Sequence, residues 1–352
     1  MAATFSDFVA LLNQHRKKIW LGQSVDTSVI HTAHAEYCTL PILTSVGCAM
    51  RRPTANEPKF DRNLRAHVGA FKSLMVDSGG FVLMNKVDCH WTVSDVAKLY
   101  RRIDADHLVA LDVPPNRKDR RNRRQAKYLQ TLRNLELLLG EFGDKIVPVA
   151  HGRGRDELEA NCRQIVKLAP NPKLIALGGM VPLLQQCGQT RNPSKDAPQA
   201  IVAEAIRCMR SYFPKTKIHL FGAGSLHTVL GVLAMGANSV DSIGWRKAAG
   251  FGSVYLPGRH RRLLTHRERE RPCRPFVSRK ELEILRACGC PACSAAPRSN
   301  IATLTKSFQP RALHNIWVLY SEIAGFLEAK RNDQDADYLS ARLSDAWLAA
   351  IT

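Results

Sequence analysis

Short apolar runs alternate with longer amphipathic segments between about residues 40 and 250 of the chain. This alternation predicts a parallel sheet, because parallel neighbours need a crossover connection, which is usually a helix. The number of units favours an α/β fold of the closed (β/α)8 TIM-barrel type, with an open doubly wound sheet as the alternative. The expected strands cover residues 40–44, 74–76, 107–111, 146–150, 174–177, 218–221 and 239–240, and the expected helices cover 93–103, 121–139, 155–168, 200–212 and 226–235.

The length of 352 residues accommodates one large barrel with a small appendage. We expect a helical lead-in at 1–39, the barrel at 40–270, a metal-binding subdomain at 271–319, and C-terminal helices packing on the barrel at 320–352. No apolar stretch is long enough to cross a bilayer, and the N-terminal charges follow the apolar residues instead of preceding them as in a secretory signal. We therefore expect a cytoplasmic protein, and reduced cysteines scattered through apparent core segments fit this expectation.

Each predicted strand is followed by a polar residue or a glycine turn. These positions are Asp77-Ser78-Gly79-Gly80, Asp112, His151-Gly152, Gly178-Gly179-Met180, Gly222-Ala223-Gly224 and Asp241-Ser242. In a barrel the carboxyl ends of the strands carry the active site, so we expect three carboxylates and one histidine to converge on one pocket. The alternative for each aspartate is an ordinary helix N-cap or turn residue, and a lone histidine is more often a satisfied polar residue than a catalyst.

Three cysteines and one histidine near the C-terminus have the spacing of a metal site. Cys288, Cys290 and Cys293 lie too close together to pair as disulfides without strain, whereas tetrahedral Zn²⁺ readily takes three cysteines and one histidine. His314, in an expected helix at 312–319, supplies the fourth ligand. Four protein ligands fill the coordination sphere, so the zinc is expected to be structural, and Cys273 is left out of the ligand set. Unrelated reduced thiols are the alternative.

The chain is strongly basic, with 51 lysines and arginines against 31 acidic residues and a formal charge of +20. Such an excess indicates a polyanionic partner, and nucleic acid is the class that fits best. A solvated charged face is the alternative for either of the two arginine-rich runs. The arginines expected to contact phosphates are Arg117, Arg120, Arg121, Arg123, Arg124, Arg259, Arg261 and Arg262.

Several of these motifs together resemble the tRNA-guanine transglycosylase family. The landmarks occur in the family's order: DSGGF at 77–81, Asp112 before Pro114, GGM at 178–180, HLFGAG at 219–224, NSVDS at 238–242, and the cysteine cluster followed by His314-Asn315. The resemblance covers roughly residues 74–319. It implies a (β/α)8 barrel with a zinc-bearing insertion, and exchange of a guanine base for a 7-deazaguanine without cleavage of the nucleic-acid backbone.

The resemblance also implies roles for individual residues. Asp241 would be the nucleophile that attacks C1′ of the nucleoside, and Asp77 the general acid and base. Asp112 would accept hydrogen bonds from the Watson–Crick edge of a base that has left its stack. The expected base-binding set is Ser78, Gly79, Asp112, His151, Gly178, Gly179 and Met180.

Some features depart from the bacterial and archaeal tRNA enzymes. His151 stands where bacterial members usually have glutamine, the residues after Asp241 differ, and an archaeal-type C-terminal RNA-binding domain is not seen. These departures favour the DNA-modifying paralogues, which insert 7-cyano-7-deazaguanine. The same exchange on tRNA is the first alternative, and a non-catalytic nucleic-acid-binding subunit is the second. A binder of polyanions gains nothing from three carboxylates in its groove, which disfavours the second. Helper proteins or a dimer partner stay open, and no membrane partner is expected.

Overall fold

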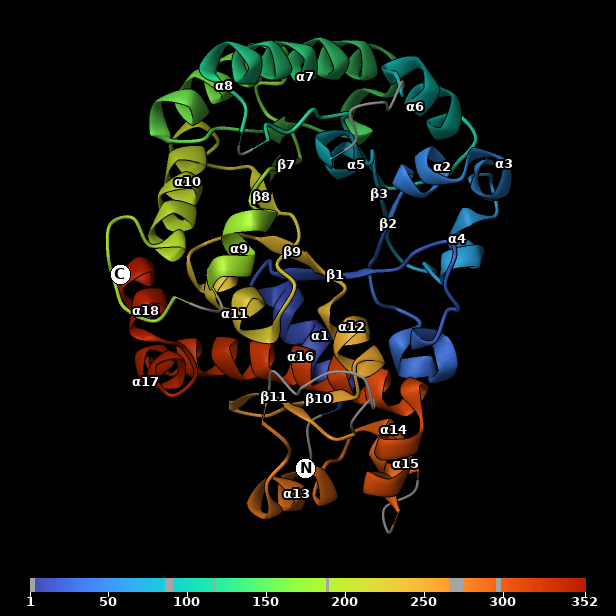
Figure 1. Cartoon of the computed structure of the whole chain (residues 1–352), viewed down its shortest axis with the longest axis vertical. Helices are drawn as coiled ribbons and strands as arrows, with labels where there is room; N and C mark the ends of the chain where they lie inside the picture. Colours follow the sequence, from blue (N-terminus) through green and yellow to red (C-terminus); the bar gives the residue numbers. More distant parts are fainter. Residues whose placement is uncertain (1–3, 86–90, 117, 188–189, 266–274, 296–298) are drawn as a thin grey trace.

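A ring of parallel strands forms the centre of the computed structural model, which describes residues 4–85, 91–116, 118–187, 190–265, 275–295 and 299–352 (Figure 1). The strands, in chain order, are β1 (Lys18–Gly22), β2 (Ile42–Ser45), β3 (Leu74–Asp77), β4 (His107–Val109), β5 (Ile146–Val147), β6 (Val149–Ala150), β7 (Leu174–Leu177), β8 (Lys217–Leu220) and β9 (Ser239–Ser242). Their spatial order is β5-β4-β3-β2-β1-β9-β8-β7-β6, and every pairing is parallel.

The two ends of this order are halves of one extended segment that Pro148 interrupts. The carbonyl of Val147 accepts a hydrogen bond from Ala110 N at 3.0 Å beside β4, and the carbonyl of Pro148 accepts one from Ala176 N at 2.8 Å beside β7. β5 therefore pairs with β4 while β6 pairs with β7. Residues 146–150 thus act as one barrel strand that closes the ring, which confirms the predicted (β/α)8 barrel.

All seven expected strands are present, and the structure adds an eighth. β1 lies inside residues 1–39, so the expectation that this whole segment is a helical lead-in is wrong and the barrel begins near residue 18. The apolar run Ile19-Trp20-Leu21 is too short to show a strand period of its own. Pairing with β2 on one side and β9 on the other makes it a strand.

Helices surround the ring, and the five that the sequence predicts in the barrel are all present (Figure 1). In the barrel the helices are α1 (Phe5–Gln14), α2 (Gly47–Arg51), α3 (Pro53–Asn56), α4 (Leu64–Val68), α5 (Gly80–Asn85), α6 (Val93–Tyr100), α7 (Arg121–Phe142), α8 (Arg155–Leu168), α9 (Val181–Cys187), α10 (Pro198–Tyr212), α11 (Leu226–Ala234) and α12 (Gly244–Gly250). The described part of the chain contains no helix that is both long and apolar enough to span a bilayer.

The strands separate two hydrophobic clusters. Alternate strand residues point to opposite faces of a sheet, so Trp20 fills the barrel interior while Ile19 and Leu21 pack outward beneath the helices. The interior cluster comprises Trp20, Leu43, Met75, Val109, Val147, Val149, Leu174 and Ala176, with Phe221 against it. Since apolar side chains fill the middle of the barrel, polar residues are left to its two ends.

The C-terminal part forms a second layer beside the barrel (Figure 1). It contains the antiparallel hairpin β10 (Ser253–Leu256) and β11 (Arg259–Leu263), and helices α13 (Arg279–Arg286), α14 (Pro291–Ser294), α15 (Asn300–Lys306), α16 (Phe308–Arg331), α17 (Asp335–Ser340) and α18 (Asp345–Ile351). α16 crosses the boundary expected at residue 319, so the expected metal-binding subdomain and the C-terminal helices share one continuous helix. Tyr320 of α16 donates a hydrogen bond to Ile19 O of β1 at 2.9 Å.

Asn315 joins α16 to the barrel through three hydrogen bonds. Its fully buried amide donates to Trp245 O at 3.1 Å and to Ser253 O at 3.2 Å, and its Oδ1 accepts from Tyr255 N at 2.7 Å. The three backbone groups belong to α12 and β10. One side chain therefore connects three elements.

We predict that Asn315→Leu lowers the free energy of unfolding by about 3 kcal/mol or more, because it leaves three buried backbone groups unpaired at about 1–3 kcal/mol each. Urea unfolding followed by circular dichroism measures the change. Asn332→Ala, at the exposed end of the same helix, is the matched control and should shift the midpoint little. Equal shifts for the two variants would contradict the role assigned to Asn315.

Candidate active site and metal centre

The polar residues expected at the strand ends gather at one end of the barrel. Asp77 is the last residue of β3 and Asp241 lies in β9, while Asp112 and His151 follow β4 and β6. All these strands are parallel, so their carboxyl ends share one rim. Gly80, in the turn after Asp77, packs against Asp112, and the charges of Asp112 and Asp241 both raise the pKa of Asp77, as expected for three carboxylates on one rim.

Two donors orient the Asp77 carboxylate. Ser45 Oγ donates to Asp77 Oδ2 at 2.7 Å, and the Gly79 backbone N–H donates to the same oxygen at 3.1 Å. Burial and then the nearby charge of Asp112 raise the pKa of Asp77 to about 7, although these two hydrogen bonds act in the opposite direction. A carboxyl group with this pKa can donate and accept a proton near neutral pH.

Asp112 and His151 form a tightly enclosed pair. His151 Nε2 lies 2.9 Å from Asp112 Oδ2 without hydrogen-bond geometry, and His151 Nδ1 has no hydrogen-bond partner in the described part of the chain. A Cβ atom on Gly80 would fall 1.8 Å from Asp112 Oδ1, and one on Gly178 would fall 2.4 Å from His151 Cε1. Only glycine fits these two turns. Buried polar atoms without partners are the kind of groups that a polar planar ligand would satisfy.

Asp241 is held by one of its two oxygens. The backbone N–H of Gly222 donates to Asp241 Oδ1 at 2.6 Å, and His219 Nε2 lies 3.6 Å from the same atom. His219 is fully buried, and its Nδ1 shares a 2.9 Å hydrogen bond with Ser239 Oγ. Among the described residues, none hydrogen-bonds Asp241 Oδ2, so that oxygen is the one left for chemistry.

His219 and Ser45 both lie against the candidate aspartates, although neither is among the site residues expected from the sequence. His219 belongs to the HLFGAG motif, and its position two residues before the end of the apolar run places it on the inner face. This alternation could have identified it. Ser45 could not be found this way, because its contact with Asp77 depends on the pairing of β2 with β3.

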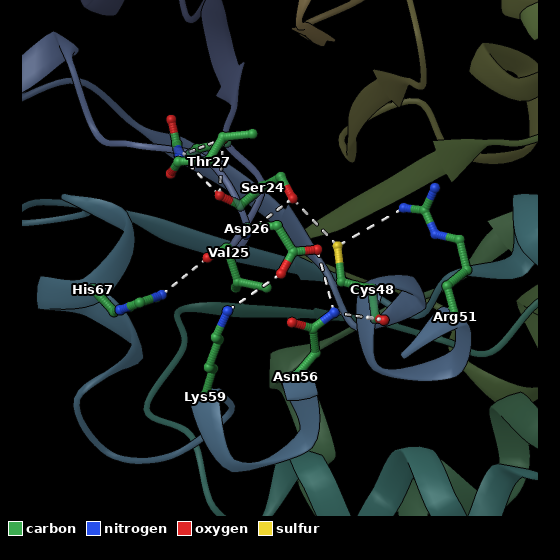
Figure 2. Close-up of polar contacts among 10 residues, drawn as sticks. Ser24, Val25, Asp26, Thr27, Cys48, Arg51, Asn56, Lys59 and His67 are labelled. Carbon is green, nitrogen blue, oxygen red and sulfur yellow. Dashed lines mark hydrogen bonds and ion pairs between the residues drawn. The ribbon is translucent and has the colours of Figure 1, made fainter. Parts of the chain in front are cut away.

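A network of polar contacts joins the loop after β1 to α2 and α3 (Figure 2). Asp26, in the loop after β1, accepts from Asn56 Nδ2 at 3.2 Å and pairs with Lys59 Nζ at 3.3 Å. Asn56 also donates to Cys48 O in α2 at 3.0 Å. The neighbouring Gly47 packs so closely on the Gly79 turn that a Cβ atom at Gly79 would fall 2.7 Å from Gly47 Cα. The network therefore supports the turn that donates to Asp77.

The first arginine run follows the carboxyl end of β4, on the rim that carries the carboxylates. Its exposed members are Arg120, Arg121 and Arg123. Arg124 is largely buried and pairs with Glu157 through Nε and Nη2, and its Nη1 donates to Asp119 O at 3.0 Å. Arg117 lies outside the described residues. Arg124 thus already holds a structural ion pair. Arg123 Nε also pairs with Asp119 Oδ1 at 3.3 Å, but its side chain is exposed, so Arg120, Arg121 and Arg123 remain as the phosphate candidates of this run.

The second run lies partly on the β10–β11 hairpin. Arg259 is exposed, whereas Arg261 and Arg262 are half-buried, and Arg262 Nε pairs with Glu281 Oε1 of α13 at 2.9 Å. The remainder of this run, residues 266–274, lies outside the described residues. Contact of either run with phosphates stays a prediction.

Cys288, Cys290, Cys293 and His314 form one compact cluster. Their ligand atoms lie within 4.8 Å of one another, and His314 Nδ1 is 3.4, 3.6 and 3.6 Å from the three sulfurs. Tetrahedral Zn²⁺ with Zn–S of about 2.3 Å and Zn–N of about 2.05 Å requires S···N separations of about 3.6 Å. The donor set and its spacing therefore fit a metal ion such as zinc.

The opposite ring nitrogen of His314 is also held. Its Nε2 lies 2.9 Å from Tyr255 O, so this nitrogen carries the proton while Nδ1 faces the thiols. His314 is near the start of α16, as expected, and Cys290 is the N-cap residue of α14. The cluster thus ties the loop that carries the cysteines to the helix that packs on the barrel.

Fold and site together define a class: a closed (β/α)8 barrel with clustered carboxylates at the strand ends and an appended Cys3His centre. The sequence matches the family model described as queuine tRNA-ribosyltransferase over residues 27–345. The match extends over most of the chain. The chain belongs to the queuine tRNA-ribosyltransferase family.

Curated relatives of the chain come from archaea and are called tRNA-guanine(15) transglycosylases. The protein from Methanocaldococcus jannaschii is 26% identical over 283 residues, which cover 77% of this chain and 39% of the relative. The protein from Sulfolobus acidocaldarius is 23% identical over 291 residues, covering 80% and 53%, and that from Pyrococcus furiosus is 27% identical over 251 residues, covering 70% and 38%. The matched part is therefore about half or less of each of these relatives.

We predict that Cys290→Ala removes the metal, because three remaining ligands cannot close a structural tetrahedral site. Metal analysis of the purified protein should find about one zinc per chain in the native protein and almost none in the variant. Cys273→Ala, outside the described residues and outside the predicted ligand set, should keep its zinc. Equal zinc content in the native protein and Cys290→Ala would contradict the ligand assignment.

Proposed function

We propose that this chain is a pentosyltransferase that exchanges guanine in a nucleic acid for a 7-deazaguanine. The observation that carries the proposal is the pair of aspartates in unlike environments on one rim. Asp241 has one oxygen held by a backbone N–H, while the pKa of Asp77 is raised to about 7. Sites that use one carboxyl group as nucleophile and another as acid and base typically place the two groups in environments that give them different pKa values.

In the first half of the reaction, Asp241 Oδ2 attacks C1′ of the target nucleoside. The bond between C1′ and the base breaks, its electron pair leaves with the guanine, and Asp77 supplies the proton that makes the base a neutral leaving group. In the second half Asp77 removes a proton from the incoming base, which attacks C1′ and frees Asp241. Gly222 N–H holds Oδ1 throughout, with His219 Nε2 3.6 Å from the same atom, so the attacking oxygen keeps its direction.

The base would bind between the strand-end turns. The Watson–Crick edge would face Asp112 and His151, whose Nδ1 lacks a hydrogen-bond partner within the described chain. The backbone of Gly178, Gly179 and Met180, with that of Gly79, would bound the purine plane. Ser78 would act indirectly, because its hydroxyl already donates to Ala110 O at 3.1 Å and so fixes the turn after Asp77.

The polymer favoured by the comparisons is tRNA. The family description and all three relatives above name tRNA, whereas the preference for DNA rests only on the departures in sequence and gains no support from them. The exposed Arg120, Arg121 and Arg123 beside the pocket would bind backbone phosphates of the polymer, and such contacts carry little sequence information. A cytoplasmic location remains the expectation for such an enzyme.

We predict that Asp241→Ala lowers base exchange by about a thousandfold or more, because no other group can form the glycosyl-enzyme. Incorporation of radiolabelled guanine into the polymer measures the exchange, and filter binding measures retention of the polymer. Ser242→Ala, at the next position, removes a hydroxyl that hydrogen-bonds Gly224 O and serves as a control for disturbance of the strand end. Substantial exchange by Asp241→Ala would remove it from the role of nucleophile.

The raised pKa of Asp77 gives a pH prediction for release of guanine in a single turnover. Release needs the protonated carboxyl, so its rate should be constant below about pH 7 and fall as the pH rises through this value. Asp77→Asn should lower the rate by about 10²–10⁴-fold and abolish this dependence. Rapid-quench measurement of released guanine between pH 5 and 9 tests both statements. An unchanged pH profile in Asp77→Asn would require a different acid.

The choice of polymer is tested with labelled guanine offered together with tRNA, duplex DNA or single-stranded DNA. We expect label in tRNA, since the named relatives are tRNA enzymes. Asp241→Ala with each polymer controls for binding without exchange. Label in DNA and none in tRNA would reverse the assignment of polymer while leaving the chemistry in place. No exchange with any polymer would favour the non-catalytic alternative.

A further inference from the structure

The end of the barrel opposite the carboxylates is lined by basic side chains, of which Lys18 and Lys217 carry charge, whereas burial and then the charge of Lys18 lower the pKa of His107 to about 4. Lys18, His107 and Lys217 lie at the amino ends of β1, β4 and β8. Each lies two or four residues before a side chain of the interior cluster, namely Trp20, Val109 or Phe221, so each shares the inward face of its strand. Together they line a pocket of about 430 Å³ whose walls also include Arg16, Lys17 and Lys173.

No acidic residue lines this pocket among the described residues. Lys17 is occupied structurally, because it donates to Leu233 O at 3.0 Å and Ala237 O at 2.6 Å, and Lys173 pairs with Asp144. Neither Lys18 nor Lys217 forms an ion pair within the described chain, although Asp106, which pairs with Arg65, lies close enough to attract Lys18 electrostatically. Burial and then the charge of Lys217 lower the pKa of Lys18, as expected for cations that face one another without a counter-ion.

Aromatic rings and an unused donor form the floor. The Lys18 ammonium lies 4.6 Å from the centre of the Trp20 ring and 3.4 Å from Ser73 Oγ. The His107 ring meets Trp20 edge to face at 5.7 Å. Trp20 is 1% exposed, and its indole Nε1–H has no hydrogen-bond partner in the part of the chain that the structure describes. A buried donor without a partner, next to two unpaired cations, is suited to an acceptor-only ligand such as an oxyanion.

We propose that this pocket binds a phosphomonoester dianion, held between Lys18 and Lys217, with Trp20 and His107 beneath it. The site is distinct from the candidate active site, because it lies at the amino ends of the same strands whose carboxyl ends carry Asp77 and Asp241. Its volume lies in the range of small-molecule pockets, so it takes a nucleoside monophosphate or the terminal phosphate of a nucleic acid, not a duplex backbone. The proposal does not depend on the proposed base exchange.

The paired strands β1 and β9 connect the two ends of the barrel. Trp20 is the register partner of Asp241 in the pairing of β1 with β9, and Lys18 is the partner of Ser239. The hydroxyl of Ser239 bonds to His219, which in turn faces Asp241. The phosphate pocket and the candidate nucleophile are therefore separated by one layer of side chains.

Isothermal titration of the native full-length chain with inorganic phosphate, cytidine monophosphate and cytidine tests the proposal. Cytidine ligands avoid the proposed guanine pocket. We expect saturable binding of phosphate and of the nucleotide, and none of the nucleoside. Lys217→Gln should weaken binding about tenfold, since it removes one of two charges in contact with a dianion. Lys18→Met, which keeps an unbranched side chain over Trp20, should have a similar effect.

Lys215→Gln is the matched control. Lys215 lies two residues before Lys217, in an exposed turn outside the pocket, and the substitution removes the same charge. It should leave the affinity within about twofold, because salt screens a charge at that distance. Equal losses for Lys215→Gln and Lys217→Gln would overturn the proposal in favour of general charge attraction, and so would equal binding of cytidine and its monophosphate. Absence of phosphate binding by the native chain would overturn it directly.

A further comparison of a 5′-phosphorylated dinucleotide with its 5′-hydroxyl form identifies the source of the phosphate. Tighter binding of the phosphorylated form than of cytidine monophosphate assigns the pocket to a chain terminus, and the reverse assigns it to free nucleotides. Thermal midpoints of all variants, followed by circular dichroism, should agree with that of the native protein. Since none of these titrations measures base exchange, failure of this proposal is distinguishable from failure of the proposed function.

Discussion

Closure of the parallel ring is the constraint on which the rest of the structure depends. Residues 146–150 bond to β4 on one side and to β7 on the other, and β1 bonds to β2 and β9. In a closed parallel barrel all strand ends of one polarity meet on one rim. Residues as distant in sequence as Ser45, Asp77 and Asp241 therefore share a single small space, and the floor of the barrel collects the amino-end side chains in the same way.

Local interactions, not the overall charge of the chain, set the pKa of Asp77. The chain carries a formal charge of +20, which by itself would favour ionised carboxylates. Salt screens distant charges over about 8–10 Å, whereas burial and a neighbouring carboxylate act at contact distance. The pKa of Asp77 is consequently raised to about 7 in a basic protein, and the hydrogen bonds from Ser45 and Gly79 only reduce that rise.

The C-terminal layer is part of the same physical unit as the barrel. α16 carries both His314, which faces the three cysteines, and Asn315, whose amide bonds to α12 and β10. The next turns of the helix bring Tyr320 to β1. α16 thus links the Cys3His cluster to α12 and β10, which follow Asp241 in the chain. The cluster and the carboxylates nevertheless use different residues.

Sequence patterns alone predict the fold class, seven of the eight barrel strands, the aspartates at the strand ends and the four residues of the Cys3His cluster. These follow from local patterns: alternating apolar runs, the residue after each run, and a cysteine spacing that suits one metal geometry. Long-range contacts in the fold make residues 18–22 a strand, pair Arg124 and Arg262 with Glu157 and Glu281, and bring His219 to Asp241. Each of these depends on partners between 19 and 221 residues away, which no local pattern encodes, because pairing and burial arise only when the ring has closed.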